Sequence, residues 1–194
     1  MHITTTPSEQ DFPMQINIHF CLEKELYAEI KTLNQMLVVN GSDIDFTKKH
    51  IPHLTVLLGN VPSLQNYTEI LKGISKIASQ IKKQKIVIYN PYRVTPKKNF
   101  VFIDVAPKNK IKMIKYAFFD EIKKYMHFSY YGRPKVSPHI TLGYIENLSD
   151  EIENTITNIR IKHTSSVISK IGISPASDKG TCLKELCIID LVSS

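Results

Sequence analysis

The sequence predicts a bilobal α+β fold with approximate two-fold symmetry. Two segments share one tetrapeptide pattern, His53-Leu54-Thr55-Val56 and His139-Ile140-Thr141-Leu142, and each follows a proline. Strand-like and helix-like periodicities alternate along the chain. Each half of the chain offers a motif strand, a helix and further strands, and such a weak internal repeat is the expected source of two similar lobes.

The elements expected in the first half follow from periodicity and turn residues. Residues 15–20 alternate polar and apolar side chains, as in a half-buried strand, and the next segment has helical periodicity. Ser63 is of a residue type favoured at helix N-caps. The expected elements are a strand over Gln15–Phe20, a helix over about Glu23–Val38, a loop at Asn40–Asp43, a strand from His53 to near Asn60 and a helix from Pro62-Ser63 to about Lys82.

The second half is expected to repeat this arrangement. The strands expected at Lys85–Tyr89 and Phe100–Val105 are joined by a turn region with two prolines and could form a hairpin. Ser149 is a favoured N-cap, with two acidic residues in the first helical turn. The expected elements are strands over Lys85–Tyr89 and Phe100–Val105, a helix over about Lys108–Met126, the strand His139–Ile145, a helix after Ser149, and strands over about Ser166–Ile173 and Glu185–Val192 with a polar loop, Ser177–Thr181, between them.

Both tetrapeptides are expected to form strands with one polar face. Successive side chains of a strand point to opposite faces, so the His and Thr of each copy lie on one side and the aliphatic residues on the other. Side by side around a two-fold axis, the two strands would present two imidazoles and two hydroxyls to one cleft. Such a set can clamp a phosphodiester and move protons on both sides of it.

The strings PHLTVL and PHITLGY, at His53 and His139, resemble the paired His-x-Thr/Ser-x motifs of the 2H phosphoesterases. They look most like the branch of 2′-5′ RNA ligases and cyclic phosphodiesterases, and the resemblance spans about residues 14–192. It implies a 2H phosphoesterase-like fold, with antiparallel sheets around a central cleft and helices outside. It also implies that the two histidines and two threonines form the catalytic site.

The reaction expected at this cleft needs no metal. Opening a 2′,3′-cyclic phosphate, or cleaving an oligonucleotide linkage by attack of a neighbouring 2′-hydroxyl, needs one proton removed from the nucleophile and one delivered to the leaving oxygen. One neutral and one cationic imidazole supply both steps. We take His53 as base and His139 as acid, and the pseudo-symmetry leaves the opposite assignment open. Thr55 and Thr141 would donate hydrogen bonds to the non-bridging oxygens.

Further residues near the motifs are candidates for substrate binding. Arg133 stands out because a guanidinium can bind phosphate oxygens bidentately, and Lys135 follows it closely. Tyr131, Tyr144 and Phe102 are candidates to stack on a base. The resemblance implies a basic residue shortly after the second motif, where this chain has a glycine and Tyr144. Arg133 or Lys135 would then have to recognise a terminal phosphate.

Composition favours one soluble domain over residues 1–194, with a disordered or loosely attached start at about residues 1–13. The chain has 42% apolar and 22% charged residues, which is ordinary for a globular protein. No apolar run reaches the roughly 20 residues needed to span a bilayer, and the polar start lacks the apolar core of a signal peptide. We therefore expect a cytoplasmic monomer without a membrane partner.

The net charge of +7 favours a polyanionic partner, such as RNA or a nucleotide. Cys21, Cys182 and Cys187 are odd in number and lie in or beside apolar stretches, so buried free thiols are expected rather than disulfides or metal ligands. His19 is expected to be structural. No cofactor and no metal site are expected, because the sequence has no tight metal-ligand cluster and no Gly-rich nucleotide loop.

Two classes of function remain open at this stage. The first is an enzyme acting on RNA ends, nucleoside 2′,3′-cyclic phosphates, 2′-5′ linked oligoadenylates or a cyclic oligonucleotide. The second is a non-catalytic module that uses the same cleft to bind RNA or a nucleotide. Intact His and Thr in both copies favour the enzyme, because binding alone does not require two proton carriers. Nothing in the sequence distinguishes among the substrates, or between hydrolysis and ligation.

Overall fold

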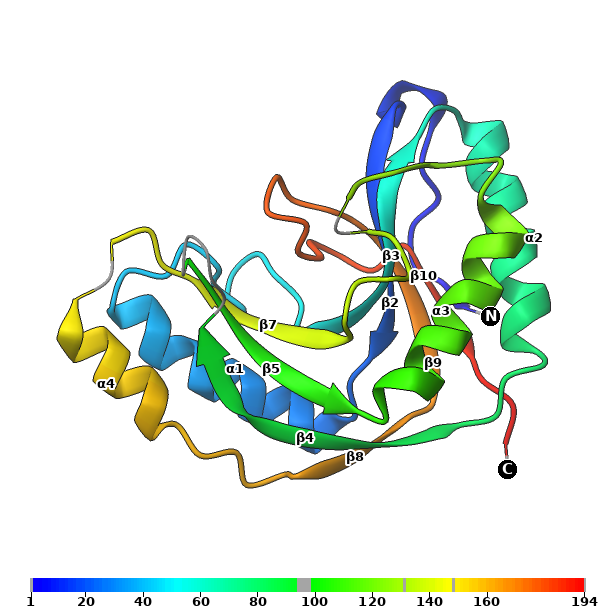
Figure 1. Ribbon diagram of the computed structural model, residues 1–194. Helices are drawn as coiled ribbons and strands as arrows, with labels where there is room; N and C mark the ends of the chain where they lie inside the picture. The colour runs from blue at the N-terminus through cyan, green and yellow to red at the C-terminus, as the bar shows by residue number, and fades with distance from the viewer. Residues whose placement is uncertain (1, 94–98, 131, 148, 194) are drawn as a thin grey trace.

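The computed structural model describes residues 2–93, 99–130, 132–147 and 149–193 (Figure 1). Within them, one sheet runs in the order β1-β10-β9-β2-β3-β7-β5-β4-β8, and β6 pairs with β3. The strands are β1 (His2–Ile3), β2 (Met14–Cys21), β3 (His53–Val61), β4 (Gln84–Arg93), β5 (Phe100–Ala106), β6 (His127–Phe128), β7 (His139–Tyr144), β8 (Ser165–Ile168), β9 (Lys170–Pro175) and β10 (Cys187–Asp190). The helices are α1 (Lys24–Val39), α2 (Leu64–Ala78), α3 (Lys108–Ile122) and α4 (Asp150–Asn158), with a 3-10 turn at Glu9–Asp11.

The sheet has two halves that meet at the motif strands. The first half holds β1, β10, β9, β2 and β3, and the second holds β7, β5, β4 and β8. β3 and β7 pair antiparallel through Leu54 and Ile140, the residues between the His and Thr of each motif. Figure 1 shows the β2–β3 ribbon rising away from the β7–β5–β4 layer at this junction. The α+β class expected from the sequence is confirmed.

The internal repeat extends to the strand beside each motif. In β2–β3 the register shifts between Ile18 and His19, after which His19 pairs with Thr55. In β5–β7 the register also shifts just before a pairing with the motif threonine, where Phe102 pairs with Thr141. A bulge bends a strand and increases its twist, so both halves curve in the same way beside the motif.

The helices cover the sheet in two pairs. α2 and α3 contact each other and β3, whereas α1 contacts β7 and α4 contacts β4. Their buried side chains recur three, four or seven positions apart, as one helix face requires. These residues are Leu26, Ile30 and Leu37 in α1, Tyr67, Ile70 and Ile74 in α2, and Ile111, Phe118 and Ile122 in α3. The predicted N-caps are confirmed, because the Ser63 and Ser149 hydroxyls accept hydrogen bonds from backbone N–H groups of α2 and α4.

One expected strand, Ser166–Ile173, is two strands in the structure. β8 pairs with β4 in the second half-sheet, whereas β9 pairs with β2 and β10 in the first. The chain therefore crosses between the half-sheets near Ser169. The sequence reading was wrong here because a run of strand-forming residues carries no signal of a change of partner strand.

The ends of several elements also differ from the expectation. α2 ends at Ala78 rather than near Lys82, and α3 ends at Ile122 rather than near Met126. After both helices, backbone N–H groups bond to carbonyls three residues earlier, which tightens the last turn and ends the helix. β10 is shorter than the expected Glu185–Val192.

The first residues of the chain lie along the sheet edge. Residues 2–3 pair with β10, and the N–H groups of Thr4 and Thr5 donate to the Leu186 carbonyl. These bonds hold part of the segment for which the sequence predicts a loose attachment. In the part of the chain that the structure describes, no helix is both long and apolar enough to cross a bilayer.

Candidate active site

The two motifs present their polar residues on one face of adjoining strands. Leu54 and Ile140 are fully buried in the core, as are Val56 and Leu142, which confirms the alternation expected from the sequence. The register through Leu54 and Ile140 is antiparallel. It therefore sets the His of each motif diagonally across from the other and beside the partner motif's Thr. His53 and His139 are also close enough that charge on His139 lowers the pKa of His53.

Both imidazoles are held by the same local hydrogen bond. Nδ1 of His53 lies 2.7 Å from the Ile51 carbonyl oxygen, and Nδ1 of His139 lies 2.8 Å from the Ser137 carbonyl oxygen. A carbonyl accepts only, so Nδ1 carries the proton in each ring and Nε2 holds the lone pair in the neutral form. Nε2 is therefore the atom of each ring that can take up and release a proton.

Asn17 on β2 connects the first His and Thr. Its side-chain Nδ2 lies 2.8 Å from the Gly180 carbonyl oxygen, 3.2 Å from His53 Nε2 and 3.1 Å from Thr55 Oγ1. The Gly180 carbonyl can only accept, so the Asn17 side-chain atom facing it is the amide nitrogen. The second hydrogen of this nitrogen is then directed to the His53 imidazole and the Thr55 hydroxyl. Asn17 therefore orients both groups, and its donation to Nε2 favours a neutral His53.

The neighbours of the two histidines differ in chemistry. The ring of His139 stacks on Phe102 at 3.8 Å between centroids with 20° between planes, and Asp104 is the β5 residue paired with His139. The ring of His53 meets His19 edge-on at 5.3 Å. Phe102, expected to stack on a base, stacks on a motif histidine through one face of its ring. It therefore lies in the site but shares its ring face with His139.

Burial lowers the pKa of both motif histidines. Desolvation lowers the pKa of His53 to about 4, and charge on His139 and His50 lowers it further, while the bond to Ile51 opposes the shift. Desolvation also lowers the pKa of His139 to about 4, where Lys115 adds to the shift and Asp104 opposes it. Both imidazoles are consequently neutral at pH 7 when no substrate is bound.

We expect the protein to lose stability as the pH falls below 6.5, the ordinary histidine value. Because the folded pKa values of His53 and His139 are lowered to about 4, the unfolded chain binds protons more tightly than the folded one. The stability from these rings is complete above pH 6.5 and is lost toward pH 4, at about 2 to 3 kcal/mol for each ring. Urea unfolding at neutral pH and at about pH 4.5 measures the loss.

A matched pair of variants assigns this effect to the buried ring. His53→Gln should reduce the difference in unfolding free energy between the two pH values. His2→Gln should leave the difference unchanged, because His2 is exposed on β1. The same pH dependence in wild type and His53→Gln would contradict the assignment.

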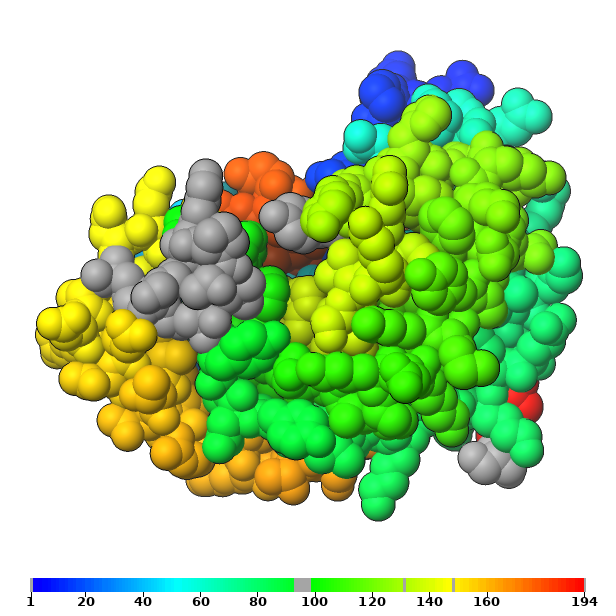
Figure 2. Space-filling model, in the orientation of Figure 1, coloured from blue at the N-terminus to red at the C-terminus, as the bar shows by residue number. Residues whose placement is uncertain are grey.

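Tyr144 lies at the end of β7 near a loop from the other half of the sheet. Lys179 Nζ sits 3.7 Å from the centre of the Tyr144 ring and also forms an ion pair with Asp43. The Tyr144 hydroxyl accepts a hydrogen bond from Asn99 at 3.0 Å. The loop that carries Lys179 also supplies the Gly180 carbonyl to Asn17. Figure 2 shows a hollow on this side of the molecule, with the orange segment after β9 visible at its back.

The basic residues predicted to bind phosphate border a groove beside α3, and their role stays a prediction. Arg133 and Lys135 are exposed and line a groove of about 610 Å³ with the aromatic rings of Tyr116 and Phe119 on α3. Lys135 Nζ lies 4.7 Å from the centre of the Tyr130 ring. The groove lining does not include the motif residues. The remaining predicted contact, Tyr131, lies outside the described residues.

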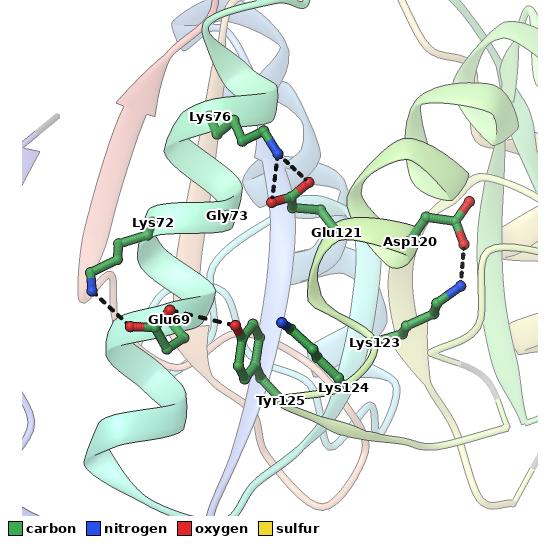
Figure 3. Close-up of a pocket in the computed structure, with 9 residues that line it drawn as sticks. All are labelled: Glu69, Lys72, Gly73, Lys76, Asp120, Glu121, Lys123, Lys124 and Tyr125. Atoms are coloured by element: carbon green, nitrogen blue, oxygen red, sulfur yellow. Dashed lines mark hydrogen bonds and ion pairs between the residues drawn. The ribbon is translucent and has the colours of Figure 1, made fainter.

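A second groove, between α2 and α3, has a volume of about 450 Å³ and a lining of charged side chains. Figure 3 shows that these charges satisfy one another: Lys76 pairs with Glu121, and Lys72 pairs with Glu69. The lining contains none of the motif residues. We assign no ligand to this groove.

The sequence reading missed Asn17, His19 and Lys179. Asn17 and His19 alternate with apolar residues in β2, and this pattern also describes a strand with a solvent-facing side. Both are fully buried in the structure, because the segment after β9 covers this face. Two polar residues placed two apart in a central strand would have indicated a buried polar site. The sequence, however, does not indicate that β2 is a central strand.

Three comparisons bear on the family and the fold. The sequence model of the 2′-5′ RNA ligase superfamily matches residues 23–165, which include both motifs. A search of curated proteins gives no match. Among solved structures, apo LigT of E. coli has a TM-score of 0.64 at 13% identity, over 95% of this chain and 99% of that one. TT0787 of Thermus thermophilus has a TM-score of 0.67 at 12% identity, over 92% of this chain and 98% of that one.

A third similar structure is the PDE domain of MHV ns2, with a TM-score of 0.53 at 14% identity over 90% of this chain and 99% of that one. At these identities the structural likeness shows a shared fold. Structures of E. coli LigT are also known with phosphate, 3′-AMP, NADP+ and ATP.

Proposed function

The chain belongs to the 2′-5′ RNA ligase superfamily, within the 2H phosphoesterases, and on this premise we propose that it is a metal-independent phosphodiesterase. Its proposed substrates are RNA ends, or oligonucleotide and cyclic nucleotide phosphodiesters with a 2′,3′-cyclic phosphate or a 2′-5′ linkage. One observation carries the proposal: each of two adjacent strands holds an imidazole, fixed through Nδ1, and a hydroxyl on the same face.

The proposed reaction uses the two Nε2 atoms on opposite sides of phosphorus. One neutral imidazole removes the proton from the attacking water or ribose hydroxyl as the new P–O bond forms. The other, protonated, donates its proton to the leaving oxygen as the old P–O bond breaks. The Thr55 and Thr141 hydroxyls donate hydrogen bonds to the non-bridging oxygens, where negative charge grows in the transition state. Run in reverse, the same steps join two ends.

The surroundings support His53 as the base and His139 as the acid. Asn17 donates to Nε2 of His53, which stabilises the neutral ring. The charged neighbours that act on His53 all lower its pKa, whereas at His139 the lowering by Lys115 is opposed by the Asp104 carboxylate. An anionic phosphate bound between the rings favours protonation of one of them. The Asp104 carboxylate beside His139 favours the protonated form of that ring.

A nucleotide substrate is supported by the charge of the protein and by its relatives. The net charge of +7 attracts polyanions, and LigT has been crystallised with 3′-AMP. We propose that Tyr144 and Lys179 contact the base or an outer phosphate. Incubating the protein in EDTA with a panel of 2′,3′-cyclic nucleotides, 2′-5′ oligoadenylates and cyclic dinucleotides, and identifying the products, tests the function. Tight binding of a panel member without any product would instead favour the non-catalytic binding module.

We expect turnover to persist in the presence of a chelator. We also expect a bell-shaped dependence on pH, because one histidine must be neutral and the other protonated. The kcat/KM profile reports the free protein, where burial lowers the pKa of both rings to about 4. Its bell should therefore lie below the ordinary histidine value of 6.5. The kcat profile should lie at higher pH, because bound phosphate raises the pKa of an adjacent imidazole. The limbs belong to the pair of rings and not to either one alone.

Two results would contradict this scheme. Activity that vanishes in EDTA and returns with Mn²⁺ would point to a catalytic metal. A kcat/KM that rises steadily to about pH 10 would show that no protonated imidazole is needed.

A further inference from the structure

A second cluster of reactive side chains lies beside the proposed reaction centre. His19 and Cys21 are two positions apart on β2 and share a face, and Glu185 lies just before β10. One imidazole nitrogen, the Cys21 sulfur and one Glu185 carboxylate oxygen all lie within 4.8 Å of one another. The Cys21 thiol donates to Glu185 Oε1 at 3.8 Å. The proposed reaction uses none of these three side chains.

The imidazole of His19 is oriented as metal-binding histidines are. Nδ1 lies 3.3 Å from the Asn17 carbonyl oxygen, the same link to a carbonyl two residues earlier that holds both motif histidines. The Cys182 sulfur, a weak acceptor, lies 3.2 Å from the same nitrogen. A metal-bound histidine usually gives its other N–H to such an acceptor, which fixes the tautomer and directs the free nitrogen at the metal. A proton on Nδ1 leaves Nε2 of His19 with a free lone pair.

That lone pair is buried and unpaired among the residues that the structure describes. His19 has no solvent exposure, and no described residue forms a hydrogen bond with its Nε2. Most buried polar atoms are paired, so an unpaired ring nitrogen calls for a missing ligand or a functional reason. Gly172 opposite it on β9 leaves the space open, because a Cβ there would lie 2.5 Å from Nε2 and 3.2 Å from Cys21 Sγ. The nitrogen and the sulfur thus border one gap.

The spacing of the three groups suits a zinc-type ion. With Zn–S near 2.3 Å and Zn–N or Zn–O near 2.0 Å, the ligand atoms of a tetrahedral site are about 3.3 to 3.5 Å apart. The Cys21–Glu185 distance of 3.8 Å needs a closure of a few tenths of an ångström, and the widest pair, within 4.8 Å, needs little more than 1 Å. Lys170 is the nearby cation, and its charge is offset by Asp190 at 3.9 Å.

We propose that His19, Cys21 and Glu185 bind one divalent ion of the zinc type, with water in the fourth position. Thiolate, imidazole and carboxylate together select zinc over magnesium or calcium. Binding replaces the Cys21 thiol proton with the ion and releases that proton. The ion ties β2 to the segment before β10, and its ligands include neither of the proposed proton carriers. This proposal departs from the expectation that the chain has no metal site and that its cysteines are not ligands.

Calorimetric titration of the chelator-treated full chain with ZnCl₂ tests the proposal. We expect one Zn²⁺ per chain and a rise in thermal stability with Zn²⁺ concentration. Cys21→Ser and the conservative Glu185→Gln should each weaken binding by at least about tenfold. Cys187→Ser is the matched control and should bind like wild type, because this buried thiol on β10 is not one of the three ligands. Co²⁺ in place of Zn²⁺ should give a sulfur-to-metal charge-transfer absorption that Cys21→Ser lacks.

The cleft itself offers two other imidazoles to Zn²⁺, so a further variant separates the two locations. Zn²⁺ binding that is lost in His53→Ala but kept in Cys21→Ser and Glu185→Gln would place the ion between the motif histidines and overturn the proposal. Absence of stoichiometric binding to wild type, or equal loss in Cys187→Ser, would overturn it as well. Turnover in EDTA is measured separately, so a failure here leaves the proposed phosphodiesterase activity intact.

Discussion

His53→Ala and His139→Ala are each expected to lower turnover by roughly 10²- to 10⁴-fold, the range typical for a general acid or base. Each substitution removes a proton carrier and leaves the aliphatic residues of its motif in the core, where Leu54 and Ile140 are fully buried. Rates with a 2′,3′-cyclic nucleotide measure the loss, and circular dichroism with thermal unfolding checks the fold. His2→Ala is the matched control, because His2 is exposed and lies on the edge strand β1.

The buried position of His53 calls for a second variant. His53→Ala leaves a cavity beside Asn17, whereas His53→Gln fills more of the space and has no ionisable group to accept or donate a proton in catalysis. We expect both variants to be equally inactive. A folded His53 or His139 variant that turns over at the wild-type rate would exclude that residue from obligatory catalysis.

Thr55→Val and Thr141→Val are expected to lower kcat by roughly 10²- to 10³-fold, as loss of one preorganised donor does in oxyanion sites. Valine keeps the shape and the strand preference of threonine, so the fold should persist. In Thr55→Val, Asn17 loses one acceptor and keeps its bond to the Gly180 carbonyl. Serine at either position restores the hydroxyl and should recover most of the rate.

Steady-state rates on one substrate measure these losses. Thr68→Val serves as the control, because the exposed Thr68 hydroxyl donates within α2, to the Leu64 carbonyl. Unchanged kcat in both motif variants would assign the two hydroxyls a structural role. A serine variant as slow as the valine variant would contradict loss of the hydroxyl as the cause.

Local patterns predicted the motif strands, the helices and their N-caps, because each depends on residues within a few positions of one another. The pairing of His with Thr on one face follows from strand alternation alone. The partners of these residues do not, since Asn17 and Phe102 reach the motifs only through strand pairing. Tertiary structure also determines that Arg133 lines a groove with residues of α3, although it lies only six residues before His139 in the sequence. Local sequence holds no information on these directions.

The crossing at Ser169 has a consequence for how the protein is made. β2 is translated before one of its two neighbours, β9, and the strands β7, β5, β4 and β8 of the second half-sheet lie between them in the sequence. The first half-sheet therefore cannot be completed while the second half is being synthesised, and β2 must wait as an open edge. Contacts between such distant parts of a chain slow folding, because a long loop has to close before they form. The two lobes look like a duplicated unit, but synthesis order makes the first of them depend on strands that follow the second.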